Sequence, residues 1–394
     1  MGTGSRAPRD AVPAHPSLAV VLREWTRIGV TGFGGPPAHI ALLRELVVER
    51  RRWLDAHAFE DANAACGLLP GPASTQMAIY CAYRVAGPTG AVIGGLAFIV
   101  PAVIAVLALS TVILASSPPL WIRGAGAGAG AAVAAVALHA VRGLLPPSLE
   151  RARQRGAVGW WAAYLVAGTA GAVLAGPYLA LVLVGCGAVE LLRRRGAASR
   201  LAGLGAGPGA LLAPAAAGGV GALAWTALKV GALSFGGGFV IIPLMQGDAV
   251  HVYHWMTNAQ FLNAVALGQI TPGPVVATIA AVGYAAHGVL GGVLAAAIAF
   301  APSFSFVLLA GGRFDRLRET PGPRAFLDGA GPAAIGAIGG AAITLAMALG
   351  EPWQFGVLAA AVIALLLGRR GVVITLLGAA LAGVAIALAG APVP

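Results

Sequence analysis

Long apolar stretches alternate with short polar segments along this 394-residue chain, which is the pattern of successive membrane spans. A helix that crosses the hydrocarbon core of a bilayer needs about 20 mostly apolar residues. By that length the chain contains about ten candidate spans, five in each half. They lie near Leu18–Gly32, Pro88–Leu114, Gly124–Val141, Val158–Gly176 and Pro177–Leu192 in the first half, and near Gly209–Leu233, Gly288–Leu309, Ala325–Leu349, Trp353–Leu367 and Val372–Ala389 in the second.

The composition of the chain points the same way. Hydrophobic residues make up 58% of it and charged residues 10%, whereas a soluble globular domain has roughly 45–50% apolar and about 25% charged residues. The chain therefore lacks the polar surface that a soluble protein of this length needs. We predict an all-α polytopic membrane protein.

The two halves of the chain share a set of glycine, proline and aromatic positions. The motif Phe-Gly-Gly at 33–35 recurs at 235–237, an offset of 202 residues. Self-similarity of this kind predicts two homologous repeats. We place an N-terminal arm at 1–16, the first repeat at 17–200 and the second at 201–394. The same offset relates Trp53 to Trp255, Phe59 to Phe261, and Pro-Gly-Pro at 70–72 to Pro-Gly-Pro at 272–274.

The two Pro-Gly-Pro segments interrupt moderately apolar regions, residues 59–84 and 261–286. A proline inside a helix removes a backbone hydrogen bond and clashes with the preceding turn. Each region is therefore either one kinked span or a pair of half-helices that enter and leave the membrane on the same side. The predicted structural breaks are Pro70, Gly71, Pro72, Pro272, Gly273 and Pro274.

The net charge of +11 comes from 25 basic and 14 acidic residues, and the arginines gather in short clusters between apolar stretches. Cytoplasmic loops of membrane proteins are rich in Lys and Arg, so the clusters indicate membrane orientation rather than nucleic-acid binding. If both Pro-Gly-Pro regions are re-entrant, all five clusters face the cytoplasm, and we favour that topology. The clusters lie at 44–52, 142–155, 193–200, 313–324 and 369–370.

Equivalent loops of the two repeats carry different charge. Arg44 and Arg50–Arg52 of the first repeat align with Gln246 and Val252–His254 of the second, and the loop Asp248–His254 is expected outside the cell. Opposite charge bias predicts that the repeats are inserted in opposite orientations. Inverted repeats, with a substrate site near the midplane between broken helices, are characteristic of secondary transporters.

Two basic residues fall inside or beside apolar segments. Arg27 and Lys229 align at the offset of 202, and Lys229 is the only lysine in the chain. Charge inside a membrane is costly, so such residues are functional candidates by default. Snorkelling near a helix end is the alternative for Arg27, which has Glu24 beside it, but no acidic residue is close to Lys229 in the sequence. We predict that both supply positive charge to a substrate site, Lys229 above all.

The motifs resemble those of the chromate ion transporters, in the long form with two fused homologous domains. The resemblance rests on Phe33–Phe59 and Leu69–Arg84 in the first half, and on Ser234–Met245, the Trp255-to-Phe261 spacing and Gly268–Tyr284 in the second. It implies a multi-pass protein of the bacterial inner membrane that exports the chromate dianion, driven by the membrane potential or the proton gradient. A permease of the same build for sulfate or another oxyanion, and a passive anion channel, remain alternatives.

A tetrahedral oxyanion needs several hydrogen-bond donors and little competing negative charge. Glycine runs let backbone N–H groups approach an anion, and a helix N-terminus adds its dipole; the alternative is that the glycines only allow close helix packing. If transport is coupled to protons, His39, Glu60 and Asp61 are the candidate carriers; the alternative for Glu60 and Asp61 is that they cap or solvate a helix start. The other predicted substrate-binding residues are Gly34, Gly35, Gly236, Gly237, Ser74, Thr75, Gln76, Asn63, Asn263, Gln269 and Thr271.

No motif typical of an enzyme is present. The chain has no HExxH, no GxSxG and no GxxxxGK(S/T) sequence, so we expect neither catalysis nor ATP-driven pumping. Cys66, Cys81 and Cys186 form no CxxC pair and are interpreted as small apolar residues. No cofactor, metal or nucleic acid is expected. The expected partners are the oxyanion, the lipid bilayer, protons if transport is coupled to them and, as an open alternative, a second copy of the chain in a homodimer.

Overall fold

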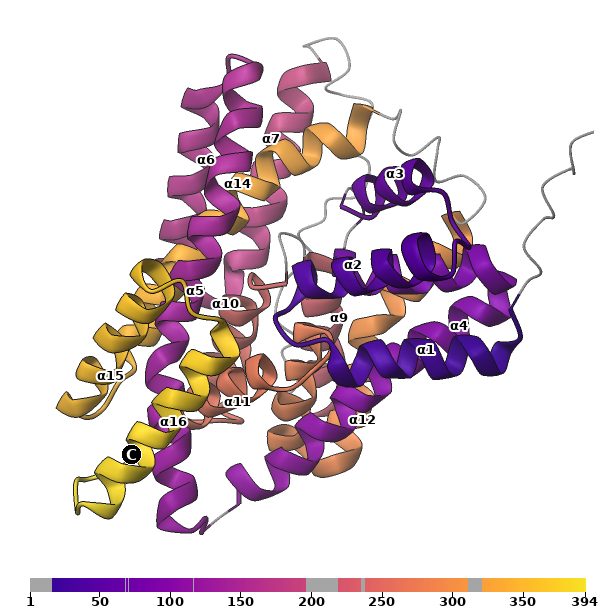
Figure 1. Ribbon diagram of the computed structural model, residues 1–394. Coiled ribbons are helices and arrows are strands. Elements are labelled where there is room, and N and C mark those ends of the chain that lie inside the picture. The colour runs from indigo at the N-terminus through magenta and orange to yellow at the C-terminus, as the bar shows by residue number, and fades with distance from the viewer. Residues whose placement is uncertain are drawn as a thin grey trace, which may run out of the picture.

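The computed structural model describes residues 16–67, 69, 71–115, 117–195, 219–234, 238–310 and 321–394 (Figure 1). Within these ranges the regular secondary structure is helical throughout, and the all-α class predicted from the sequence is confirmed.

The first half supplies helices α1 to α7, several of them continued by short π or 3-10 turns. They are α1 (Leu18–Thr31), α2 (Pro36–Arg44), η1 (Glu45–Arg50), α3 (Ala56–Cys66), α4 (Ala73–Ile113), α5 (Leu120–Gln154), α6 (Val158–Ala170), η2 (Gly171–Ala175), η3 (Gly176–Tyr178) and α7 (Leu179–Arg195).

The second half supplies the corresponding series in the same order. It consists of α9 (Val220–Leu233), α10 (Ile241–Gln246), η5 (Gly247–Val252), α11 (Asn258–Ile270), η6 (Val275–Thr278), α12 (Ile279–Ala310), α14 (Pro321–Met347), α15 (Pro352–Val362), η7 (Ile363–Leu367) and α16 (Val372–Leu388).

The apolar stretches predicted as spans fall on these helices. The span predicted over Gly124–Val141 is longer in the structure, because α5 continues to Gln154. The first residues of the span predicted over Gly209–Leu233 lie outside the described residues. The segment Asp248–His254, predicted as a loop, is helical in its first part: Gly247–Val252 form a π-helix, η5, with Asp248 buried. Cys66, Cys81 and Cys186 are buried free thiols.

Helices α4 and α12 each fold back on themselves at a glycine with positive φ, Gly87 (φ 68°) and Gly288 (φ 64°). A β-carbon at Gly94 would lie 2.5 Å from the Ala82 β-carbon, whereas twelve residues along a straight helix span about 18 Å. Each is thus a pair of antiparallel helices. The turn needs glycine because its backbone conformation disfavours side chains.

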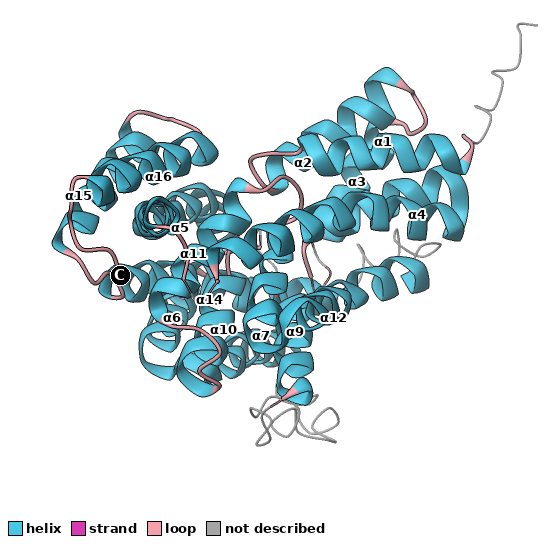
Figure 2. Ribbon diagram, turned by 90° about the horizontal axis from the view of Figure 1, so that it is seen from below, coloured by secondary structure: helices cyan, strands magenta, loops and turns pink. Residues whose placement is uncertain are grey.

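The helices form two bundles, which occupy opposite sides of the molecule (Figures 1 and 2). We call α1–α4 with α9–α12 the core bundle, and α5–α7 with α14–α16 the scaffold. In the scaffold, α5 packs on α15 and α16, α14 packs on α6 and α7, and α5 and α14 contact each other. Small residues allow this approach, since a β-carbon at Gly168 would lie 1.8 Å from the Ala333 carbonyl oxygen.

The outer surface suits a lipid environment. Large apolar side chains such as Leu174, Leu290 and Leu309 are about four-fifths exposed (83%, 82% and 79%). Apolar side chains are stable against lipid, and a helix is suited to that environment because its backbone groups hydrogen-bond to one another. Among the described residues, five helical stretches are long and apolar enough to cross a membrane by length and composition, with the folded pairs α4 and α12 each counted as one stretch: Ala73–Ile113, Leu120–Gln154, Val158–Arg194, Val275–Leu309 and Gly322–Met347.

Candidate anion-transport site

Each Pro-Gly-Pro break is inserted into the other half of the core bundle. Gly273 (φ 100°) donates its amide to the Gly32 carbonyl oxygen of α1's end at 3.0 Å. Gly71 (φ 118°) lies against α9 and α12, where a β-carbon would be 3.4 Å from the Gly231 carbonyl oxygen and 3.3 Å from Ser303 Oγ. The positive φ and these close approaches explain the glycine at the centre of each break.

Helix starts gather around these breaks. Helix α4 begins directly after Pro72, and η6 begins directly after Pro274. The loops that precede α2 and α10 reach the same place, because β-carbons at Gly35 and Gly238 would both lie 3.9 Å from Val275. Helix N-termini carry partial positive charge and unpaired amides, which favours an anion between them. Of the predicted residues, Pro70, Gly236 and Gly237 lie outside the described residues.

Several described residues next to the breaks carry buried hydroxyl or amide groups. Ser74, Thr75 and Gln76 are buried in the first turn of α4. In the part of the chain that the structure describes, Thr75 Oγ1, Ser303 Oγ and Gln269 Nε2 are buried without a hydrogen-bond partner. An unsatisfied buried polar group costs about 1–3 kcal/mol. These groups are therefore available to a ligand or to water.

Other predicted polar residues are already satisfied or lie elsewhere. Thr271 Oγ1 donates to the Leu267 carbonyl oxygen at 3.0 Å. Asn63 is half-buried on α3, and Asn263 of α11 faces α5, where a β-carbon at Gly126 would lie 2.9 Å from its Cγ. Asn263 therefore lies at the contact between the core bundle and the scaffold. Gly34 (φ 104°) lies in the loop before α2, close to the convergence of helix starts.

His39 ties the first repeat to the second break. Its Nε2 donates to the Gly32 carbonyl oxygen at 2.9 Å, and that oxygen also accepts from Gly273. Because the carbonyl can only accept, Nε2 carries the proton. His39 is buried on α2, outside the long apolar spans, and its ring packs edge-on against Phe98 at 5.1 Å. Burial lowers the pKa of His39 below its ordinary value, and the bond to Gly32 only partly opposes this.

Lys229 has an acidic partner that the sequence did not reveal. Its Nζ lies 2.8 Å from Asp248 Oδ1 and 2.7 Å from Oδ2, and Thr226 Oγ1 donates to Oδ2 at 2.7 Å. Both side chains are almost fully buried, at 2% and 1% exposed. Lys229 points to η5, whereas Gly231, two residues on and hence on the opposite face of α9, contacts the first break. The lysine charge is therefore neutralised in this conformation.

The first repeat has the reverse arrangement at the equivalent place. Glu24, which aligns with Thr226, is buried on α1 and binds Arg50 Nη2 at 2.6 Å and Arg51 Nη2 at 2.7 Å. Arg27, the equivalent of Lys229, is exposed and stays out of the buried centre.

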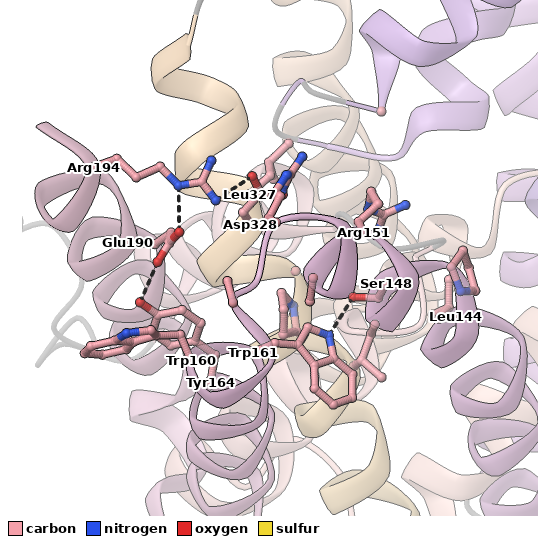
Figure 3. Close-up of a pocket in the computed structure, with 18 residues that line it drawn as sticks. Leu144, Ser148, Arg151, Trp160, Trp161, Tyr164, Glu190, Arg194, Leu327 and Asp328 are labelled. Carbon is pink, nitrogen blue, oxygen red and sulfur yellow. Dashed lines mark hydrogen bonds and ion pairs between the residues drawn. The ribbon is translucent and has the colours of Figure 1, made fainter.

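A pocket of about 230 Å³ opens at the arginine-rich end of the scaffold (Figure 3). We call it the arginine pocket. Arg194 lies 2.7 Å from Glu190 and 3.0 Å from Asp328, and Arg155 also pairs with Asp328. Arg151 makes no ion pair with any described residue. The lining is Gly67, Leu144, Pro147, Ser148, Arg151, Ala152, Arg155, Ala157, Trp160, Trp161, Tyr164, Glu190, Arg194, Leu327, Asp328, Gly331, Pro332 and Ile335.

The remaining predicted proton carriers lie on α3, at the exposed side of the core bundle. Glu60 is exposed and binds Arg44 at 3.3 Å, and Asp61 is half-buried. The sequence missed Ser303, Asp248 and the arginine pocket. Beyond the Pro-Gly-Pro regions a one-residue gap changes the offset between the repeats from 202 to 201, and Pro302 then aligns with Pro101. Ser303 follows Pro302, so the repeat contained a signal for it. Asp248 had none, because nineteen residues separate it from Lys229.

The fold and this site define a multi-pass helical membrane protein with a polar centre built from broken helices, the architecture of a solute transporter. Comparison with known proteins identifies the family of transporters. The family model described as "Chromate transporter" matches residues 19–191 and 221–384, and the chain belongs to that family. It is accordingly a multi-pass protein of the inner membrane.

Similar proteins match over most of their length. The chain is 32% identical to the chromate transport protein of Cupriavidus metallidurans over 357 residues, 87% of this chain and 88% of that protein. It is 30% identical to the chromate transport protein of Pseudomonas aeruginosa over 361 residues, 88% and 85% of the two chains. It is 29% identical to a probable chromate transport protein of Synechococcus elongatus over 345 residues, 84% and 85% of the two. No solved structure matches the chain significantly.

Proposed function

We propose that this chain is a secondary active transporter that exports chromate across the inner membrane by alternating access. The observation that carries the proposal is the reciprocal insertion of the two Pro-Gly-Pro breaks, each seated against the opposite half. Broken helices that meet near the middle of two repeats are where transporters bind ions and anions. Chromate is inferred as the substrate from the relatives that are named as chromate transport proteins.

The donors around the breaks suit a tetrahedral dianion. Helix α4 starts directly after the first break and η6 directly after the second, and the buried hydroxyls of Ser74, Thr75 and Ser303 lie beside the first break. Hydrogen bonds to a charged group contribute about 1.5–3 kcal/mol each. The buried carboxylates nearby, Glu24 and Asp248, are both held by basic side chains, so they oppose the anion weakly.

The membrane potential is sufficient to drive export. One elementary charge moved across 100 mV corresponds to about 2.3 kcal/mol. A dianion leaving a cell with a negative interior therefore gains about 4.6 kcal/mol per 100 mV, or roughly a 2000-fold concentration ratio. The arginine pocket on the cytoplasmic side would raise the local concentration of the anion before it enters. We take residues 17–200 and 201–394 as the two repeats, inserted in opposite orientations.

The test is uptake of radiolabelled chromate into inverted membrane vesicles that contain the protein. We expect saturable uptake when the vesicle interior is made positive, as it is when respiration energises such vesicles. Sulfate in tenfold excess and a collapsed proton gradient form separate arms, which report on selectivity and on proton coupling. A current that is ohmic and does not saturate would instead identify a channel, and no accumulation under any gradient would refute the proposal.

A further inference from the structure

The scaffold is built from two equivalent halves. The Gly-Ala-Gly motif that starts at Gly128 of α5 recurs at Gly329 of α14, an offset of 201 residues. A β-carbon at Gly128 would lie 2.1 Å from the Ala379 carbonyl oxygen of α16, and one at Gly329 would lie 2.2 Å from the Cys186 carbonyl oxygen of α7. Helix α5 therefore packs on α16 in the same way as α14 packs on α7.

The core bundle does not use these two halves equally. Helix α11 lies on α5 and α16. A β-carbon at Gly130 would be 3.0 Å from the Leu262 β-carbon. Helix α3, the counterpart of α11, has its extensive contact with α4 and none of comparable extent with α14 or α7 among the described residues. Two symmetric bundles are thus joined asymmetrically, as a transporter open to one face requires.

The uncovered face of α3 can be named residue by residue. Glu60, Ala64 and Gly67 are exposed, and their spacing places them on one side of the helix and its end. The equivalent positions after α11's start, Leu262, Ala266 and Gln269, are buried. The same stripe is therefore buried in one repeat, with Leu262 against α5, and open in the other.

The arginine pocket occupies the place where α3 would dock. Its residues Asp328 and Gly331 correspond, at the offset of 201, to Ala127 and Gly130, which line the contact between α5 and α11. Five residues of α11 and its N-cap line that contact: Thr257, Asn258, Ala259, Leu262 and Asn263. From the first half of the core bundle, Gly67 alone lines the arginine pocket among the described residues.

The charges on the two surfaces are complementary. The pocket lining carries three arginines, Arg151, Arg155 and Arg194, against two acids, Glu190 and Asp328, which pair with Arg155 and Arg194. The lining is therefore net positive, and at its edge Glu60 would take the place of the apolar Leu262. The present contact of Glu60 is an exposed ion pair with Arg44, 3.3 Å apart. Exposed pairs stabilise a protein by about 0–1 kcal/mol, so exchanging Arg44 for the pocket arginines costs little.

We propose that the arginine pocket is the docking site of α3 in the opposite conformation of the transporter. In that conformation α3 packs on α14 and α7 with Glu60 among the arginines, and α11 leaves α5. The side of the protein that the pocket opens to is then sealed, while the side sealed by α11 opens. The inference rests on the proposed alternating-access function and specifies which surfaces exchange.

Paired cysteines test the docking directly. In a background with Cys66, Cys81 and Cys186 replaced by alanine, one protein carries Gly130→Cys with Leu262→Cys, and the other carries Gly331→Cys with Glu60→Cys. The first pair is close in this structure, and its β-carbons fall near disulfide range. We expect both pairs to form disulfides on mild oxidation in membranes, and each disulfide to abolish chromate uptake reversibly. In the protein with all four cysteines, the first disulfide should prevent the second.

The outcomes separate the two proposals. If the Glu60–Gly331 pair never forms a disulfide while the Gly130–Leu262 pair does, at either sign of membrane potential and with or without chromate, docking is wrong. Formation of both disulfides in one molecule would also overturn it. Mutually exclusive disulfides in a protein that fails to move chromate would leave docking intact and refute the substrate. A pair of Glu60→Cys with Gly143→Cys, at an open position of α5, controls for random collision.

Discussion

Neutralising Lys229 with and without its partner separates a role in folding from a role in transport. Lys229→Met leaves the Asp248 carboxylate buried, with Thr226 as its one remaining side-chain donor among the described residues. Removing one member of a buried ion pair costs about 3–5 kcal/mol, because the other charge stays uncompensated. We expect Lys229→Met and Asp248→Leu each to lower stability by an amount in that range.

The double variant Lys229→Met/Asp248→Asn removes both charges and keeps an oxygen that can accept from Thr226. Replacing a buried pair by neutral groups of similar volume is often close to neutral for stability. We therefore expect the double variant to recover to within about 1 kcal/mol of the parent. If Lys229 also serves the anion, the recovered protein still fails to transport chromate.

The assay combines two measurements on the same preparations. Thermal unfolding of the detergent-solubilised protein, followed by loss of its monodisperse chromatographic peak, ranks stability, and vesicle uptake gives transport. Glu24→Gln is the matched control in the first repeat; its arginine partners are 36% and 38% exposed, so the loss should stay near 1 kcal/mol. Near-normal chromate uptake by the stable double variant would refute a role of Lys229 in binding the anion.

Three further outcomes follow from the packing. Gly273→Ala should abolish chromate uptake, because a β-carbon there meets Ala102 at 2.7 Å and φ is 100°. Adding Ala102→Gly to that variant should restore only part of the uptake, since the backbone cost of about 1–2 kcal/mol remains. Full uptake by Gly273→Ala alone would contradict this. The pKa of His39 is lower in the folded protein than in the unfolded chain, so the unfolded chain binds more protons. The free energy of unfolding should therefore fall as the pH drops through about 6.5. Thermal unfolding measured over a range of pH should show a weaker pH dependence for His39→Gln. Gly168→Leu should prevent folding of the scaffold, because a β-carbon would lie 1.8 Å from the Ala333 carbonyl oxygen. Gly159→Leu, in open space on the same helix, should yield normal amounts of monodisperse protein. Equal yields of the two variants would show that α6 does not pack as described.

The helices and their breaks were predictable because their causes are local. The length of an apolar run, a proline within it and a glycine beside it act over a few residues, so Pro88 and Gly288 marked the starts of long helices correctly. The repeat added the correspondence between the halves without any structure. Ser74, Thr75 and Gln76 follow the predicted break at Pro-Gly-Pro 70–72, and the structure finds them buried in the first turn of α4.

The pairing of charges needed the tertiary structure. Nothing in the spacing of Lys229 and Asp248 indicates contact, because the intervening residues end one helix and build another before the π-helix η5 brings Asp248 back. The repeat even suggested that Arg27 and Lys229 are alike, yet one is exposed and the other is buried in an ion pair. Equivalent positions in a repeat share backbone geometry but take their partners from different surroundings.

By itself, the sequence determined that this chain is helical, lies in the membrane and is built twice from one pattern. These properties follow from hydrophobic length and from local backbone chemistry. Which copy of the pattern meets the scaffold was decided by the tertiary structure alone, since α11 is seated on α5 and α3 is not seated on α14. The two copies have nearly the same local preferences, and a choice between equivalent contacts is made by packing of the whole molecule.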